Sequence, residues 1–159
     1  MGKEQQQSTI ARLYEDSVGK RRKQRDGVVV TPLEVVDFQV RSVLQNLKTQ
    51  GYHWTDPRIE WLDPFGGTGI FLARLLQIVP VSPWGKVCIA RRCIMLEIDR
   101  EAAQIAANNL AIVHREETGL RGKIRVLCVD TFSLPPDVDL WSPQMDRFTV
   151  TPLNLLEIA

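Results

Sequence analysis

The stretch WLDPFGGTGIF, residues 61–71, has the pattern of a strand that runs into a glycine-rich turn and then a helix. Gly66, Gly67 and Gly69 allow backbone conformations that other residues avoid, and they let a ligand approach the backbone closely. In open α/β folds, ligands bind beside such turns, at the carboxyl ends of the strands. The stretch therefore predicts the first strand and the ligand-binding turn of an α/β domain.

The segments around this turn alternate between strand and helix patterns. The expected strands are 59–63, 92–98, 124–130 and 147–150. The expected helices are 31–51, 71–77 and 100–110, and the expected loops are 80–85 and 133–145. This order predicts a parallel sheet with right-handed crossovers, an α/β fold of Rossmann type.

The helix at 31–51 has recognisable start and stop signals. Thr31 is expected to be its N-cap, with Pro32 at the first helical position and Glu34 completing a capping box. Gly51 is expected to end the helix. The apolar positions recur at helical spacing and predict one buried face made of Val36, Val40, Val43, Leu44 and Leu47.

The first 26 residues differ in composition from the rest. They are polar and end in the basic run KRRKQR, residues 20–25. We expect residues 1–26 to be a solvated lead-in, with a phosphate-contacting arm as the alternative. Residues 27–159 are expected to form one partial domain.

Composition excludes several classes of protein. The 159 residues are 44% hydrophobic and 25% charged with a net charge of +1, as in an ordinary soluble domain. The amino terminus has no apolar signal region, and no apolar run is long enough for a membrane span. Cys88, Cys93 and Cys128 are unevenly spaced within apolar runs, which favours reduced thiols over disulfides or a metal site. We therefore expect a cytoplasmic protein without a metal or a membrane partner.

Three acidic residues stand at the carboxyl ends of the expected strands: Asp63, Glu97 and Asp130. The turn lacks the Gly-Lys-Ser/Thr of a P-loop and the Gly-x-Gly-x-x-Gly of a dinucleotide site. A carboxylate at Asp63 would repel a pyrophosphate but suits an ammonium group. Glu97 is placed to accept hydrogen bonds from ribose hydroxyls, and Asp130 from an exocyclic amine. These features together indicate S-adenosylmethionine.

Simpler roles for the same residues remain open. The glycines could form a plain strand-to-helix turn, and Thr31 is explained as a helix cap. Glu97 could be a surface acid at a strand end, where Asp99 is the better helix cap. Asp130 could cap a turn with Thr131.

Four segments, taken in order, resemble the N6-adenine-specific DNA methyltransferases, and most of all the methylase modules of large restriction-modification enzymes. GVVVTP at 27–32 resembles the family's G-x-x-x-T-P segment, which approaches the methionine end of the cofactor. DPFGGTGIF at 63–71 resembles the D-P-x-x-G-T-G-x-F cofactor loop. EID at 97–99 resembles the segment that binds the ribose, and DTF at 130–132 the segment that meets the adenine ring.

The resemblance covers residues 27–132 and implies a Rossmann-like S-adenosylmethionine-dependent methyltransferase fold with an incomplete parallel sheet. It implies that Phe132 packs against the adenine face. The implied cofactor-binding residues are Thr31, Pro32, Asp63, Phe65, Gly66, Gly67, Gly69, Glu97, Asp130 and Phe132.

The chain departs from the family in its catalytic motif. The family carries Asn or Asp, then Pro-Pro and an aromatic residue, after the fourth strand; these groups hold the target amine and stack on the flipped base. Here TPLNLLEIA, residues 151–159, occupies that place, and Pro135-Pro136 comes one strand too early. No residue of the chain is therefore expected to carry the catalytic step.

We consequently expect the cofactor-binding part of a restriction-modification methyltransferase, truncated, frameshifted or split before that motif and inactive alone. DNA would bind through a recognition region that is missing or supplied by a partner chain, which would also complete the sheet. The alternatives are a non-catalytic partner of a split methyltransferase, or a fragment of an RNA or protein methyltransferase. A dehydrogenase remnant is disfavoured by the loop spacing.

Overall fold

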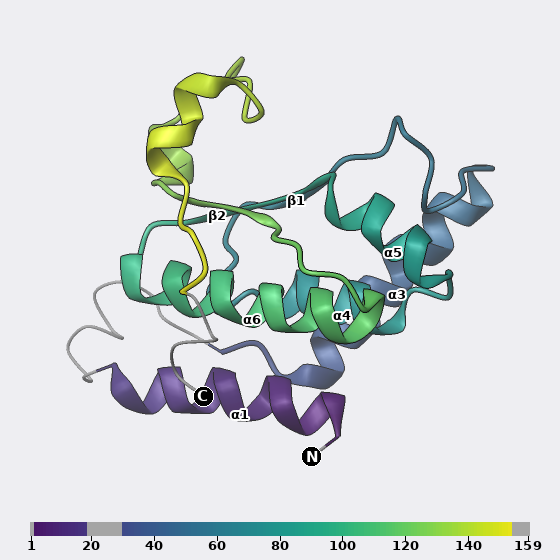
Figure 1. Ribbon diagram of the computed structural model, residues 1–159, viewed down its shortest axis with the longest axis horizontal. Coiled ribbons are helices and arrows are strands. Elements are labelled where there is room, and N and C mark those ends of the chain that lie inside the picture. Colours follow the sequence, from purple (N-terminus) through teal and green to yellow (C-terminus); the bar gives the residue numbers. More distant parts are fainter. Residues whose placement is uncertain (1, 19–29, 154–159) are drawn as a thin grey trace.

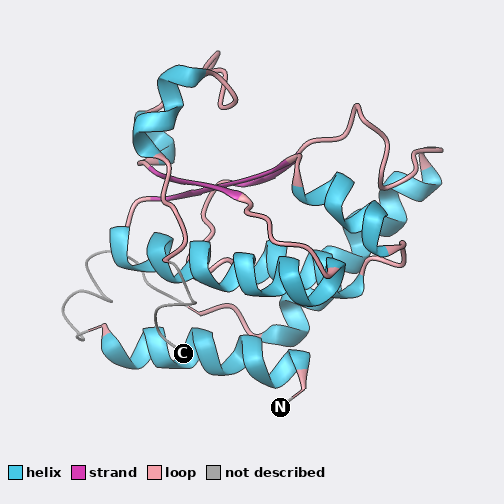
Figure 2. Ribbon diagram, in the orientation of Figure 1, coloured by secondary structure: helices cyan, strands magenta, loops and turns pink. Residues whose placement is uncertain are grey.

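The computed structural model describes residues 2–18 and 30–153, which form a mixed α/β fold. Strands β1 (Trp61–Asp63), β2 (Cys93–Glu97) and β3 (Arg125–Cys128) form a parallel sheet in the order β1-β2-β3 (Figure 2). Trp61 lies opposite Cys93, and Ile94 lies opposite Arg125. The predicted parallel α/β arrangement is confirmed, and the carboxyl ends of all three strands meet at one edge.

The α-helices lie on one side of this sheet (Figure 1). They are α1 (Lys3–Ser17), α3 (Leu33–Thr49), α4 (Ile70–Ile78), α5 (Pro83–Ala90) and α6 (Arg100–Thr118). Their apolar faces form the main core with Trp61, Cys93 and Met95 from the strands. The opposite face of the sheet carries a smaller core, where Met145 packs on residues of β2 and β3. The sheet is therefore covered by helices on one face and by the segment after β3 on the other.

Helix α3 begins later than its sequence signals predict. Pro32, and not Thr31, is the N-cap, and its carbonyl accepts the N–H groups of Val35 and Val36. The predicted capping box is wrong, because Pro32 is extended at ψ 142° and thus outside the helix. The consequence is that the Thr31 side chain has no capping role.

The stop signal and most of the buried face of α3 are confirmed. Gly51 has φ 83°, and the N–H of Tyr52 reaches back to the carbonyl of Leu47 at 2.9 Å. The prediction that Val43 is buried is wrong, since 49% of its surface is exposed. The side chains of Val36, Val40 and Leu44 are buried as predicted.

Helix α1 replaces most of the expected solvated lead-in. Gln7, Ala11, Tyr14 and Val18 recur at helical spacing and are buried against the rest of the fold. The polar composition of this segment concealed the inward-facing stripe, since two of its four members are polar. The basic run at 20–25 and residues 27–29 lie outside the described residues.

Two further segments correct the expectations. The expected loop at 80–85 contains the start of α5, where the Ser82 side chain accepts the N–H of Gly85. The expected fourth strand is wrong: residues Pro143–Phe148 form the 3₁₀ helix η2, and Thr149 makes one antiparallel bridge with Leu127. The chain thus turns back beside β3 and adds no parallel strand.

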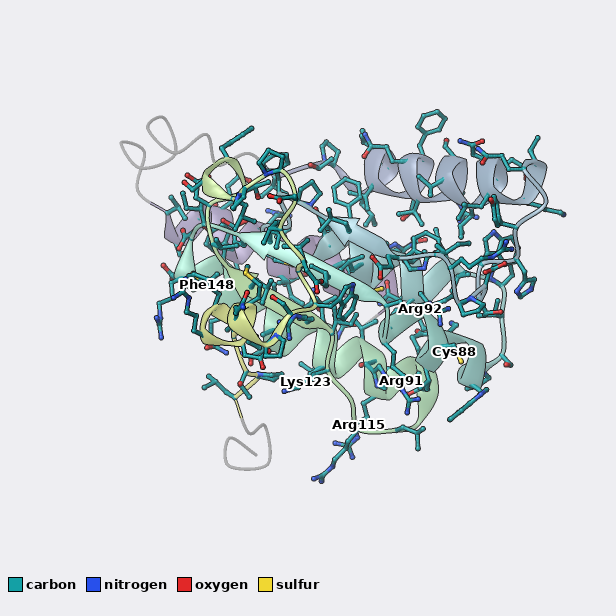
Figure 3. All side chains as sticks on the ribbon, turned by 90° about the horizontal axis from the view of Figure 1, so that it is seen from above. Cys88, Arg91, Arg92, Arg115, Lys123 and Phe148 are labelled. Atoms are coloured by element: carbon teal, nitrogen blue, oxygen red, sulfur yellow. The ribbon has the colours of Figure 1, made fainter. Side chains whose placement is uncertain are left out.

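The amino-terminal edge of the sheet is fixed by Arg92, which lies at the start of β2 (Figure 3). Its guanidinium donates to the carbonyls of Thr55 and Ile59 at 2.9 and 3.0 Å. Arg91 and Lys123, also labelled in Figure 3, are exposed immediately before β2 and β3. Arg91, Arg92 and Lys123 therefore lie at the edge opposite the carboxyl ends, together with the exposed Glu60. Among the residues that the structure describes, no helix is long and apolar enough to cross a membrane.

Candidate functional site

A cavity of about 920 Å³ lies at the carboxyl edge of the sheet. Three segments contribute to its wall: the turn after β1, residues 97–100 at the end of β2 and beyond, and residues 130–132 after β3. Parallel strands bring these three turns together, although they lie far apart in the sequence. The cavity has the size typical of a small-molecule site.

The structure brings most of the predicted site residues to this cavity. Seven of them line it: Thr31, Phe65, Gly66, Gly67, Glu97, Asp130 and Phe132. Pro32, Asp63 and Gly69 do not line it. Thr31 reaches the cavity because α3 begins only after Pro32.

The glycine loop, residues 64–69, requires glycine for two different reasons. Gly67 and Gly69 have φ angles of 54° and 80°, in the left-handed region that other residues rarely adopt. Gly66 has no room for a Cβ atom, because the buried side chain of Met95 fills the space. The loop is therefore held by close packing on β2 as well as by its backbone conformation.

Glu97 connects this loop to the next helix. Its Oε2 accepts the N–H of Gly67 at 2.8 Å, and its Oε1 accepts the N–H of Asp99 at 2.7 Å. Each carboxylate oxygen can accept a second hydrogen bond. Glu97 thus shapes the cavity and keeps acceptor capacity for hydroxyl groups of a ligand.

Asp99 caps α6 as predicted, through a hydrogen bond from the Glu101 N–H at 2.9 Å. Asp99 also lines the cavity, a role that the sequence analysis did not give it. The signal in the sequence that could have indicated this role is its position two residues after Glu97.

Asp130 has the capping role that the sequence left open. Its Oδ1 accepts the N–H of Phe132 at 3.0 Å and its Oδ2 accepts the Ser133 hydroxyl at 2.7 Å, which caps the 3₁₀ helix η1 (Thr131–Ser133). The Thr131 hydroxyl donates to the carbonyl of Pro64 and joins this segment to the glycine loop. The residue that caps η1 therefore also lines the cavity.

Two aromatic rings stand at the rim of the cavity. Phe65 and Phe132 are 61% and 85% exposed, and their ring centroids lie 5.4 Å apart at an interplanar angle of 36°. Exposed rings of this size are costly in water unless a flat apolar surface covers them. The rim can therefore pack on one face of a heteroaromatic ring.

Asp63 lies behind the loop and not in the cavity wall. Burial is the main cause that raises its pKa to about 6, and the nearby Glu97 carboxylate adds to the effect. The Phe65 N–H donates to Oδ1 at 3.3 Å, while Oδ2 is buried with no hydrogen-bond partner among the described residues. To bind Asp63, the ammonium group of a ligand would thus have to reach it through the glycine loop.

Helix α1 supplies a wall that the sequence analysis missed. Ala11 and Tyr14 line the cavity, and both lie on the buried face of α1. The spacing of the buried residues at 7, 11, 14 and 18 was the signal that could have found it.

Comparison with solved structures finds similar folds, two of them in restriction-modification enzymes. No family profile and no curated protein sequence matches the chain. The structure of a DrdV–DNA complex is similar with a TM-score of 0.72 and 24% identity, over 82% of this chain and 13% of that one.

Two Type ISP restriction-modification enzymes, both with DNA or a DNA substrate mimic, are also similar. LlaBIII has a TM-score of 0.69 and 28% identity, over 91% of this chain and 11% of its own. LlaGI, in a nuclease-deletion form, has a TM-score of 0.64 and 29% identity, over 81% of this chain and 11% of its own. The chain thus corresponds to about a tenth of much longer enzymes.

Proposed function

We propose that this chain is the S-adenosylmethionine-binding part of a DNA adenine-N6 methyltransferase module in a restriction-modification system. The observation that carries the proposal is the convergence of the glycine loop, Glu97 and Asp130 on one cavity at the carboxyl edge of the sheet. The similarity to LlaGI and LlaBIII supports the restriction-modification context.

The charges around the cavity favour a ligand without phosphates. Among the described residues that line it, Glu97, Asp99 and Asp130 are acidic and Arg100 is basic. Carboxylates repel phosphate groups and attract cations. S-adenosylmethionine carries a sulfonium and an ammonium group and no phosphate, so its charge complements this wall.

The remaining wall fits the other parts of that molecule. Glu97 can accept hydrogen bonds from ribose hydroxyls, and Asp130 from the adenine amine. The rings of Phe65 and Phe132 offer an apolar surface for the base. Thr31 stands at the amino-terminal side of α3, where the resemblance expects the methionine end.

The bound molecule would supply an electrophilic methyl group on its sulfonium. The residues of this chain would bind and orient the molecule, and its 159 residues contain no Asn/Asp-Pro-Pro-aromatic motif to hold a target amine. The proposal therefore assigns cofactor binding to these residues, and DNA recognition and methyl transfer to groups beyond them.

Calorimetric titration with S-adenosylmethionine tests the proposal. Glu97→Ala and Asp130→Ala are expected to weaken binding by about 100-fold and about tenfold, since each removes hydrogen-bond acceptors for the ligand. Glu60→Ala is the matched control, because Glu60 is exposed just before β1, at the opposite edge of the sheet.

Titrations with ATP and NAD extend the test to phosphate-bearing ligands, which are expected not to bind. Absence of S-adenosylmethionine binding by the folded chain would overturn the proposal. Binding that Glu97→Ala leaves unchanged would move the site elsewhere and overturn it as well.

A further inference from the structure

Helix α1 carries three buried residues on a single face, and two of them, Ala11 and Tyr14, line the cavity. Gln7, Ala11 and Tyr14 are 1%, 2% and 6% exposed, and they are separated by four and three positions. This spacing places them in one row along a helix. The two polar members of this row bond to Asn109, within α6, and to Asp99, the N-cap of α6.

At the amino-terminal end of this row, Gln7 forms a reciprocal amide pair with Asn109. Each side-chain nitrogen donates to the other residue's side-chain oxygen at 2.9 Å. The Asn109 amide also donates to the carbonyl of Thr68, in the glycine loop, at 3.1 Å. A buried pair of this kind fixes the position of both helices, because leaving either amide unpaired is costly.

Tyr14 makes the connection at the second end of the row. Its hydroxyl donates to Oδ2 of Asp99 at 2.7 Å. The N–H of Asp99 donates to Glu97, and Glu97 in turn accepts the N–H of Gly67. The hydrogen bonds therefore run from α1 through Asp99 and Glu97 to the glycine loop, and return through Asn109 to α1.

We infer that α1 is a strap that holds the glycine loop and Glu97 in the ligand-binding geometry, with Gln7 and Tyr14 as positioning residues. The identity of the ligand rests on the proposed function; the strap itself rests on the hydrogen bonds. Ala11 and Tyr14 also close the cavity wall directly. Ligand binding and the packing of α1 on the site are thermodynamically linked. A ligand that needs this geometry must therefore hold α1 in place.

The experiment combines calorimetry with hydrogen exchange on the full chain. The variants are Tyr14→Phe, which removes only the hydroxyl, and Gln7→Leu, which keeps the helix and removes the amide. Gln5→Leu is the matched control, since Gln5 is an exposed residue of the same helix. Exchange is followed at the amides of 66–70, of α1 and of β2, the last as a measure of global unfolding.

Each positioning variant is expected to weaken S-adenosylmethionine binding by about tenfold and to speed exchange in the glycine loop by a similar factor. Exchange in the glycine loop should rise by more than exchange in β2, which separates positioning from lost stability. The ligand should slow exchange in α1 of the unaltered chain. Gln5→Leu should behave like the unaltered chain in every measurement.

Three results would overturn the inference: unchanged affinity in both variants, unchanged loop exchange, or a ligand that leaves α1 exchange as it was. If the unaltered chain does not bind S-adenosylmethionine, the proposed function fails. The loop exchange of the ligand-free variants then still decides whether α1 positions the loop.

Discussion

The Glu97 carboxylate accepts a hydrogen bond from the backbone N–H of Gly67 across 2.8 Å. This contact joins the end of β2 to the glycine loop that follows β1, thirty positions away in the sequence. The second oxygen of the same carboxylate accepts the N–H of Asp99, at the start of α6. One side chain therefore fixes the relative positions of two of the turns that form the cavity.

Glu97→Gln is expected to lower the free energy of unfolding by about 1–3 kcal/mol. The amide can accept only one of the two backbone N–H groups, so the other loses its partner. Urea unfolding measures the change, with Glu60→Gln as the control because Glu60 is exposed before β1. Equal stability of the two variants would show that the contacts of Glu97 contribute nothing.

Gly66→Ala is expected to lower the free energy of unfolding by about 2 kcal/mol, since the new methyl group would overlap the buried Met95 side chain. Gly67→Ala, which meets open space but keeps φ 54°, should lose only about 1 kcal/mol, from its left-handed backbone. Thermal or urea unfolding of the two variants compares their free energies of unfolding.

A double-mutant cycle identifies the cause of the Gly66 effect. The cost of Gly66→Ala should fall when Met95 is also replaced by Ala. An undiminished cost in that background would assign the effect to the backbone and not to the overlap with Met95.

Asp63→Asn is expected to change how stability depends on pH. The pKa of Asp63 rises from its ordinary 3.8 to about 6 in the folded chain, so between these values the folded state holds a proton that the unfolded state has lost. The contribution of Asp63 to stability therefore falls as pH rises through this window. The stability of the variant relative to the unaltered chain should increase by about 2.4 kcal/mol from pH 4 to pH 7. Urea unfolding at each pH measures it, and parallel pH profiles would contradict the expectation.

The purified chain is expected to bind S-adenosylmethionine without transferring its methyl group. Nothing in the 159 residues matches the Asn/Asp-Pro-Pro-aromatic motif that would hold an adenine amine. Incubation with adenine-containing DNA and methyl-labelled cofactor should leave the DNA unlabelled. Labelled N6-methyladenine would show that other residues of this chain perform the step.

Local signals in the sequence predicted several elements correctly. These elements are the strand that runs into the glycine turn, the Asp99 cap of α6 and the end of α3 at Gly51. Each depends only on residues within one or two helical turns. The same local reasoning failed at Thr31: Thr followed by Pro is typical of an N-cap and a first helical residue, but in the structure Pro32 is the N-cap.

The fourth strand shows why other parts were not predictable. Residues 147–150 have the composition of a strand, but Pro143 starts a 3₁₀ helix and Thr149 meets the outer edge of β3 in the antiparallel direction. Strand patterns report that a segment suits a sheet. They do not report which neighbour it meets.

The sequence by itself determined the strand–helix order from α3 to β3, except for α5, and the three acidic positions at the strand ends. These follow from hydrophobic period and turn chemistry along short stretches. Only the tertiary structure decided which residues share the cavity. Gln7 and Asn109 are 102 positions apart, and no local pattern pairs them. Burial pairs them, since two amides removed from water are stable only when each satisfies the other. The same requirement brought α1, a segment of polar composition, into the wall of the site.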